Sequence, residues 1–432
     1  MTNASGTRLA PASSVSRAPG LHTDYQKIVN ATFVVFIASG AVVIVEPSPY
    51  DLLFFITLPI WFVGGFSVHR TFFVPASILF GYTVAGFLAL IPYWDNADSS
   101  VFQYVSAFLS FTALFFAVFF ANETERRTEL CLKAYMVGAF IASLCAIAGY
   151  FDIGGLGELF TRNARATGPF KDPNVYGSFA FVGAVYLAQN LTLGRTRHPI
   201  ASAIALVSIV SGVFLSFSRG SWGATVVAMT LMAVFGFFTM DNRRMKRRVA
   251  MGALVAVIVI AVALAVLLSL EETRAFFLQR ASVTQDYDEG ATGRFGNQAR
   301  SLPMLVERFW GFGPRQFEMV FGLVPHNTYI GSFANNGWIG GFLFILLAAI
   351  TCFVGFRLMM RASPFRRHAQ VVFPSLFAFF LQGFQIDIDH WRHFYLLLGA
   401  VWGLEAARQR GVERQSRPVE AHVQGEPRLR DF

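Results

Sequence analysis

The chain is poor in charged residues and in cysteine. Only 14% of its 432 residues are Asp, Glu, Lys or Arg, whereas a typical soluble domain has about 25%. Such a chain has too little polar surface to enclose a water-soluble globule of this size, which excludes an ordinary cytosolic enzyme. Its 54% of hydrophobic residues, with 48 Phe among them, exclude a disordered chain as well. The three cysteines form no CxxC pair, so neither a disulfide framework nor a cysteine metal site is expected.

Hydrophobic runs long enough to cross a bilayer recur along the sequence. A bilayer core about 30 Å thick requires roughly 20 apolar residues in each helix. Because the runs are continuous rather than alternating, helices are expected instead of strands. Ten strong runs and two weaker ones follow one another, at 28–45, 52–68, 72–92, 101–121, 131–151, 174–193, 198–217, 221–240, 249–270, 328–355, 370–386 and 391–406. We therefore predict an all-α polytopic membrane protein with about twelve transmembrane helices.

These runs divide the chain into five parts. Residues 1–27 are polar and lack the apolar core and cleavage site of a signal peptide, so we interpret them as a disordered cytoplasmic tail. Residues 28–270 hold the first nine helices, and residues 328–406 hold the last three. Between them, residues 271–327 form a loop that is too polar to span a membrane and longer than usual connections. Residues 407–432 form a polar and basic cytoplasmic tail.

The net charge of +9 is explained by membrane topology rather than by binding to nucleic acid. If the N-terminus lies in the cytoplasm, most of the 35 Lys and Arg residues fall in cytoplasmic segments, as the positive-inside rule requires. Both termini are therefore expected in the cytoplasm. The densest basic run, residues 241–248, then lies next to anionic lipid headgroups. Membrane lipids are expected partners, and nucleic acid is excluded.

The long loop 271–327 and the other outer segments hold the remaining basic residues, on the side where topology disfavours them. An anionic ligand on that side is the simplest reason for their presence. Part of the loop is expected to be helical, because apolar residues from Phe295 to Phe309 recur at helical spacing, with Arg294 and Arg300 on more polar faces. Such a helix would lie on the membrane surface or cap the helix bundle.

Two residues stand at the predicted membrane boundary on the outer side. His326 directly precedes a hydrophobic run. It is either a general base or substrate-orienting group, or an interfacial histidine at a helix start with Asn327 as N-cap. Arg219 lies between two apolar runs with almost no loop, where an ionisable group is costly. Its guanidinium offers the fork of donors that suits a phosphate or diphosphate; the alternatives are a structural ion pair or a contact with lipid headgroups.

A third segment, residues 165–174, combines turn residues with two cations. Asp172 and Asn174 are expected to cap the helix that follows. Helix capping does not explain why the cations Arg165 and Lys171 occur in this segment. These two residues are therefore candidates for binding an anionic substrate.

A small polar cluster near the end of the chain contains Asp387, Asp389 and His390. Its spacing is not typical of a metal site, and no metal is expected. The Asp-Ile-Asp sequence is more typical of a solvated helix end.

Four motifs occur in an order that resembles the O-antigen ligase and polymerase family. They are Arg-Ala-Thr-Gly-Pro-Phe-Lys-Asp-Pro-Asn at 165–174, Ser-Arg-Gly-Ser-Trp at 218–222, Gly-Arg at 293–294 and Pro-His-Asn-Thr-Tyr at 325–329. The resemblance covers residues 160–350 and extends to the twelve-span layout with a large, late periplasmic loop. It implies an enzyme of the bacterial inner membrane that transfers a glycan from undecaprenyl diphosphate at the periplasmic face, with inversion and without a metal, a nucleotide sugar or another cofactor.

The resemblance also implies roles for individual residues. The family's histidine falls on His326 and its two essential arginines fall on Arg219 and Arg294, so these three are the catalytic residues we expect. The arginines would stabilise the charge of the leaving lipid diphosphate, and His326 would deprotonate or orient the acceptor hydroxyl. The residues expected to bind substrate are Arg165, Lys171, Asp172, Asn174, Asn327 and Arg300.

The sequence departs from the family after the histidine motif. The family often has Glu-x-Gly there, whereas this chain has Ala334-Asn-Asn-Gly337. Neither Asn335 nor Asn336 can act as a base, so a second carboxylate is not expected at this point.

Three activities remain open. A ligase passes a finished polysaccharide to lipid A–core, whereas an O-antigen or exopolysaccharide polymerase passes the growing chain to the next lipid-linked repeat, and the motifs do not separate them. A flippase or transporter is expected to have charges at mid-membrane depth and inverted repeats. The apolar runs carry almost no charge at their centres, and no repeat is visible. The favoured interpretation is therefore an O-antigen ligase-like glycosyltransferase.

Overall fold

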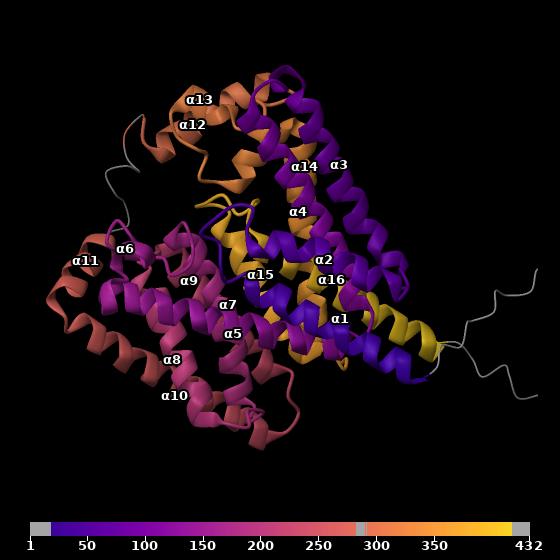
Figure 1. The fold of residues 1–432 in the computed structure, drawn as a ribbon, viewed down its shortest axis with the longest axis vertical. Helices are drawn as coiled ribbons and strands as arrows, with labels where there is room; N and C mark the ends of the chain where they lie inside the picture. Colours follow the sequence, from indigo (N-terminus) through magenta and orange to yellow (C-terminus); the bar gives the residue numbers. More distant parts are fainter. Residues whose placement is uncertain (1–18, 282–289, 291, 417–432) are drawn as a thin grey trace, which may run out of the picture.

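The structure is a computed structural model that describes residues 19–281, 290 and 292–416. Nearly all of its regular structure is helical (Figure 1). The sheet in this part of the chain is small and consists of β1 (Thr161–Arg162) paired antiparallel with β2 (Arg165–Ala166). The predicted class, an all-α protein with several membrane-length apolar helices, is confirmed.

Six helices of the described residues are long and apolar enough to cross a membrane, so the predicted number of twelve is not confirmed. They are the helical stretch Arg70–Tyr93, which contains α3 (Phe73–Leu90), and α4 (Ala97–Ala121), α5 (Thr124–Tyr150), α9 (Arg219–Phe238), α10 (Arg243–Leu268) and α14 (Thr328–Met360). Two further apolar helices, α2 (Pro49–Val63) and α8 (Pro199–Leu215), have 15 and 17 residues. Both are shorter than the roughly 20 residues that a bilayer core requires.

The remaining helices of the described residues are shorter or more polar. They are α1 (Pro19–Ser39), α6 (Gly157–Phe160), α7 (Pro173–Thr192), α11 (Glu271–Ala281), α12 (Arg294–Glu307), α13 (Gln316–Phe321), α15 (Arg366–Gln382) and α16 (Arg392–Ser416), with the 3-10 turns η1 (Arg70–Phe72), η2 (Ile91–Tyr93) and η3 (Ile153–Gly155).

Several boundaries differ from those expected. α1 starts at Pro19, inside the segment predicted as a disordered tail, and residues 1–18 of that tail lie outside the described residues. α16 continues to Ser416, inside the predicted C-terminal tail, whose residues 417–432 also lie outside them. The long loop 271–327 contains α11, α12 and α13, so it is partly helical as the apolar spacing indicated.

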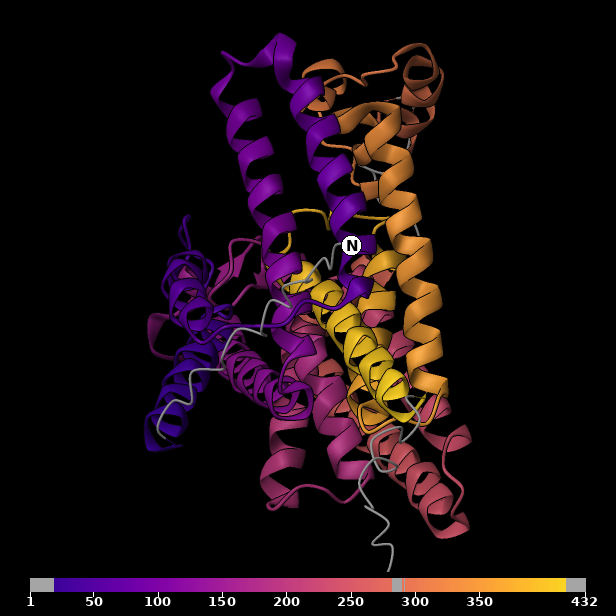
Figure 2. The same ribbon diagram turned by 90° about the vertical axis from the view of Figure 1, so that its right-hand side faces the viewer.

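The helices form two groups that are joined by the last two helices (Figure 1, Figure 2). α3, α4 and α14 stand side by side, with α12 and α13 near their tip, whereas α5 and α7 to α10 form the other group. α15 packs against α7 and α9 on one side and against α14 on the other, and α16 packs along α4. The chain between α15 and α16 therefore lies where the two groups meet.

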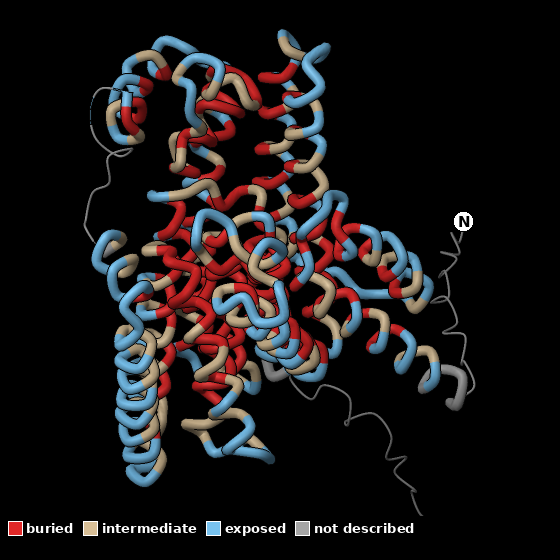
Figure 3. The backbone as a smooth tube through the Cα atoms, turned by 60° about the vertical axis from the view of Figure 1, so that its left-hand side comes forward, coloured by how far each residue is buried: buried red, intermediate tan, exposed pale blue. Residues whose placement is uncertain are grey.

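Aromatic packing holds the N-terminal helices to the bundle. The Phe36 and Phe33 rings of α1 contact Phe116 and Phe119 of α4. The Phe54 ring of α2 contacts Phe115 of α4, so α1 and α2 are both packed against α4. Buried residues gather at the centre of the molecule, whereas α10 is exposed along its length (Figure 3). An apolar helix with so much exposed surface requires lipid around it, since large apolar patches are rare on water-soluble monomers.

α14 bends sharply at Gly337, whose φ of 63° and ψ of −168° lie outside the helical region. The backbone N–H of Trp338 donates to the Phe309 carbonyl oxygen at 2.9 Å, which ties the bend to the long loop. A Cβ at position 337 would lie 2.5 Å from the same oxygen, and glycine is the residue that adopts a positive φ without strain. The bend separates residues 328–336 from the long part of α14.

Candidate active site

One cavity of about 660 Å³ brings together five of the residues predicted from the sequence: Arg165, Asn174, Arg219, Arg294 and His326. They come from the segment before α7 and from the starts of α7, α9, α12 and α14. Arg280 of α11 lines the same cavity. We call it the basic cavity, after Arg165, Arg219, Arg280 and Arg294. The predicted catalytic residues thus lie around one hollow, although they are spread over more than a hundred positions of the sequence.

The turn between α8 and α9 positions Arg219. Phe217 adopts a left-handed φ of 47°, and the Ser218 Oγ accepts a hydrogen bond from the backbone N–H of Ser221 at 3.3 Å, which caps α9. Arg219 is therefore the first residue of α9, and both Arg219 and Gly220 line the basic cavity. The first N–H groups of a helix carry partial positive charge, so the start of α9 strengthens the attraction of this cavity for an anion.

Arg165 joins two of the sequence motifs. Its Nε donates to the Ser216 carbonyl oxygen and its Nη2 donates to the Asn174 Oδ1, both at 2.8 Å. The Ser221 Oγ in turn donates to the Asn174 carbonyl oxygen at 3.3 Å. The segment before α7 and the turn before α9 are therefore held together by Arg165, with its guanidinium at the wall of the basic cavity.

Arg294 stands at the start of α12, which is a second helix N-terminus at the cavity. Its Nη1 donates to the Gln385 carbonyl oxygen at 3.3 Å, and its guanidinium lies 4.7 Å from the centre of the Phe295 ring. These contacts link the long loop to the chain between α15 and α16.

His326 is held by Asp387, a residue 61 positions further along the chain. The Asp387 carboxylate accepts the backbone N–H groups of His326 and Asn327, each at 3.1 Å, and one of its oxygens lies 4.0 Å from the His326 Nδ1. His326 adopts a left-handed φ of 47°, which is uncommon for a residue other than glycine. The two N–H bonds stabilise this conformation and leave the imidazole ring at the wall of the basic cavity.

The expectation of a solvated helix end at Asp387 and Asp389 is wrong. Asp389 is only 4% exposed, and Asp387 is engaged by the two N–H groups. Burial, together with the neighbouring Asp389 carboxylate, raises the pKa of Asp387 to about 7. Burial opposes the charged form of His390, but Asp389, 3.5 Å from the His390 Nδ1, raises the pKa of this imidazole above its ordinary value.

The other residues predicted to bind substrate do not line the basic cavity. Lys171 forms an ion pair with Glu46 at 3.3 Å, and Asp172 caps α7 by accepting from two N–H groups, as expected. Asn327 caps α14 in the same way. Arg300 binds the Asn297 side chain at 2.5 Å. These ion pairs and hydrogen bonds hold the fold together. Asn327 affects the basic cavity indirectly, because it fixes the start of α14 next to His326.

Three site residues lie outside the sequence motifs: Asp387, Gln382 and Gln385. Gln382 and Gln385 line the basic cavity from the end of α15. Nothing in their spacing relates them to His326, because they reach the cavity only through the packing of α15 against α9 and α14. Arg280 is one of the basic residues of the long loop whose presence on the outer side we explained by an anionic ligand.

One further feature concerns metal binding, and another concerns Asn335, which lies where this chain departs from the family pattern. Among the residues that the structure describes, no group of three or more His, Cys, Asp or Glu side chains is arranged to hold a metal ion. The Asn335 Oδ1 accepts the backbone N–H of Arg315 at 3.2 Å, so this asparagine holds the loop against α14.

The fold and the cavity define a multi-pass membrane protein with an arginine-rich site at the ends of its apolar helices. Residues 204–345 match the model of the family described as O-antigen ligase, which confirms the resemblance that the motifs indicated. The matched segment runs from α8 into α14 and contains Arg219, Arg294 and His326. The comparison with curated proteins gives no match.

The pKa of Asp387 predicts a pH dependence. The carboxylate is protonated below about pH 7, and a neutral carboxyl group holds the two N–H groups and the His326 ring less strongly. The catalysed rate should therefore rise as the pH passes upward through about 7, in an assay of glycan transfer by the protein in nanodiscs. Asp387→Asn should lower the rate about tenfold at pH 8 and shift or flatten this rise.

Asp95→Asn is the control, because Asp95 is exposed and does not line the basic cavity. It should leave the profile unchanged. An Asp387→Asn variant with the rate and pH midpoint of the unmodified protein would contradict this role of Asp387.

Proposed function

We propose that this protein is an O-antigen ligase-type glycosyltransferase that moves a glycan from undecaprenyl diphosphate to a sugar hydroxyl. The observation that supports this most directly is the basic cavity. It combines four arginines with the N-termini of α9 and α12, and guanidinium groups and helix N-termini both favour a diphosphate. The family match over residues 204–345 supports the same conclusion.

The proposed reaction is a single displacement at the anomeric carbon. The acceptor hydroxyl oxygen forms the new glycosidic bond on one face of the sugar while the bond to the lipid diphosphate breaks on the other, so the configuration is inverted. Arg219 and Arg294 stabilise the negative charge that develops on the leaving diphosphate. His326, which lines the same cavity, orients the acceptor hydroxyl or takes up its proton.

We further propose that the enzyme lies in the bacterial inner membrane with both termini in the cytoplasm. The basic cavity then faces the periplasm, where a glycan on undecaprenyl diphosphate is available. The acceptor is lipid A–core for a ligase, or the next lipid-linked repeat for a polymerase of the same family.

Replacement of His326 tests the catalytic assignment. His326→Ala should reduce transfer at least about 100-fold, as expected for the loss of a general base, while insertion into the membrane stays normal. The measurement is the transfer rate of purified protein in nanodiscs, scaled to the amount of folded protein. His198→Ala is the control, since His198 is exposed at the other end of α8. Normal transfer by His326→Ala would refute the assignment.

A conservative change at Arg219 tests whether the guanidinium binds the diphosphate. Arg219→Lys keeps the positive charge but loses the forked donors, so transfer should fall about 10-fold to 100-fold. Binding of undecaprenyl diphosphate should weaken in parallel. The matched control is Arg243→Lys in the exposed basic run, which should behave like the unmodified protein. Equal diphosphate binding by the Arg219→Lys variant would contradict the assignment.

The glycans of a deletion strain distinguish the possible activities. If the protein is a ligase, long polymer should accumulate on the lipid carrier and be absent from lipid A–core. If it is a polymerase, single repeats should remain on the carrier or acceptor and long chains should be missing. The measurement separates surface glycolipid from the undecaprenyl-linked pool. An unchanged profile would contradict the proposed transfer and favour a transporter.

A further inference from the structure

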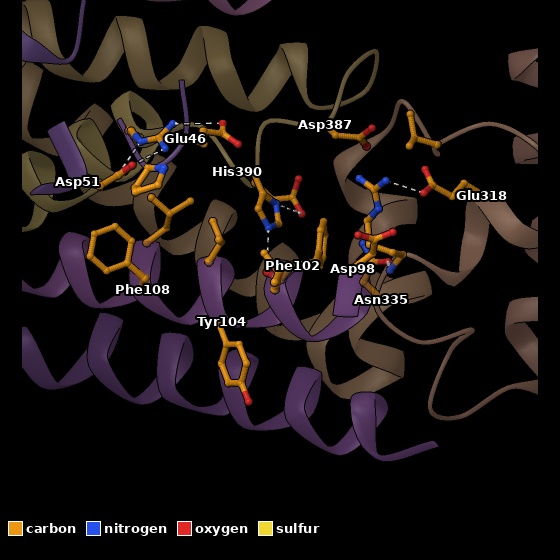
Figure 4. A pocket seen from close by; sticks show the side chains of 18 of the residues that line it. Glu46, Asp51, Asp98, Phe102, Tyr104, Phe108, Glu318, Asn335, Asp387 and His390 are labelled. Carbon is orange, nitrogen blue, oxygen red and sulfur yellow. Dashed lines mark hydrogen bonds and ion pairs between the residues drawn. The ribbon is translucent and has the colours of Figure 1, made fainter. Parts of the chain in front are cut away.

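A second cavity, of about 810 Å³, meets the basic cavity at the contact between His326 and Asp387. Pro325 and Asp387 line the second cavity, whereas their chain neighbours His326 and Ile386 line the first. Six carboxylates line the second cavity: Glu46, Asp51, Asp98, Glu318, Asp387 and Asp389. Figure 4 labels the first five of them. We call it the acidic cavity.

The arginines of the acidic cavity are engaged by carboxylates. Arg392 donates to both oxygens of Asp51, at 2.8 and 2.6 Å, and the Arg315 Nη2 lies 2.6 Å from Glu318. Their charges are therefore largely compensated. Glu46 and Asp389 also have cationic neighbours, Lys171 at 3.3 Å and His390 at 3.5 Å. The cations at this cavity are thus matched by carboxylates, while Asp98 and Asp387 also line it, so repulsion between like charges disfavours a phosphate or carboxylate there.

Aromatic side chains form one wall of the acidic cavity. Phe102, Tyr104 and Phe108 of α4 all line it. The centres of the Phe102 and His390 rings lie 4.0 Å apart, and both residues are labelled in Figure 4. Aromatic faces bind the apolar C–H faces of a ligand, and carboxylates are strong acceptors for hydroxyl donors. The combination suits a hydroxyl-rich ligand with apolar faces, which is the chemistry of a saccharide.

The rest of the cavity wall is apolar and open. Phe55 and Val101 line it and are 61% and 59% exposed. Val101 lies on α4, one of the helices long and apolar enough to cross a membrane. The cavity is therefore accessible from the side of the protein that contacts lipid, which suits a saccharide on a lipid anchor.

We propose that the acidic cavity binds the acceptor saccharide, and that the part of the saccharide inside it carries no phosphate or carboxylate. This inference rests on the proposed glycan transfer. It divides the two substrates by charge: the donor diphosphate lies among the arginines and the acceptor lies among the carboxylates. The acceptor hydroxyl then approaches the anomeric carbon where the cavities meet, beside His326.

The test measures saccharide binding directly, on the full chain in nanodiscs. The probes are N,N′-diacetylchitobiose, a neutral disaccharide, and a disaccharide of similar size that contains glucuronate. The neutral probe should bind, and the anionic probe should bind at least about tenfold more weakly. Asp389→Asn should raise the dissociation constant of the neutral probe about tenfold, since a charged acceptor is lost. Phe102→Leu, which keeps the apolar volume but removes the ring, should raise it about fivefold.

Two controls make the result decisive. Asp95→Asn, an exposed acid in the turn before α4, should leave saccharide binding unchanged. Binding of undecaprenyl diphosphate, measured on every variant, reports on the basic cavity and on folding, and it should be unaffected by Asp389→Asn and Phe102→Leu. In the transfer assay, Asp389→Asn should raise the KM for the acceptor more than the KM for the donor.

The outcomes separate the inference from the proposed function. If undecaprenyl diphosphate binds and glycan transfer occurs, but the neutral disaccharide does not bind or binds equally to Asp389→Asn, the acidic cavity is not the acceptor site. Preference for the glucuronate probe would overturn the inference in the same way. If the disaccharide binds in the acidic cavity but undecaprenyl diphosphate does not bind the protein, the proposed function fails instead.

Discussion

The carboxylate of Asp387 is the contact on which the arrangement of the site depends. It accepts the backbone N–H groups of His326 and Asn327 and so holds His326 in a left-handed conformation that its sequence alone does not favour. The same contact fixes the start of α14 against the chain that follows α15. Because Asp387 and His326 line different cavities, this pair also forms the boundary between the two proposed substrates.

The basic cavity shows how a membrane protein can concentrate charge without placing it in lipid. Its arginines lie at helix ends or in the segment before α7, where they avoid the high cost of a charge at the bilayer centre. Arg165 and Arg294 donate to backbone carbonyl oxygens of other segments. Each of these two guanidinium groups therefore links parts of the chain that are distant in sequence while it also lines the site.

Much of the site was predictable because its residues belong to local motifs. Arg219 and His326 stand at abrupt ends of apolar runs, and Asp172 precedes a helix that needs a cap. The same local reasoning does not reveal partners. Lys171 was grouped with Arg165 by proximity in the sequence, yet the fold pairs Lys171 with Glu46. Asp387 and Asp389 were interpreted as a solvated helix end, yet Asp389 is buried and Asp387 binds two N–H groups. Both outcomes depend on the helices packed around these residues and leave no pattern in the segment itself.

By itself, the sequence determined the membrane class, the helical content, the family resemblance and most of the charged candidates, because hydropathy and motif spacing are properties of contiguous residues. The tertiary structure decided which helices are long enough to cross a membrane, the bend of α14 at Gly337, the contact between Asp387 and His326, and the presence of two adjoining cavities of opposite charge. These features join segments up to hundreds of residues apart. They are set by how whole helices pack, since the position of one helix against another depends on side chains along both.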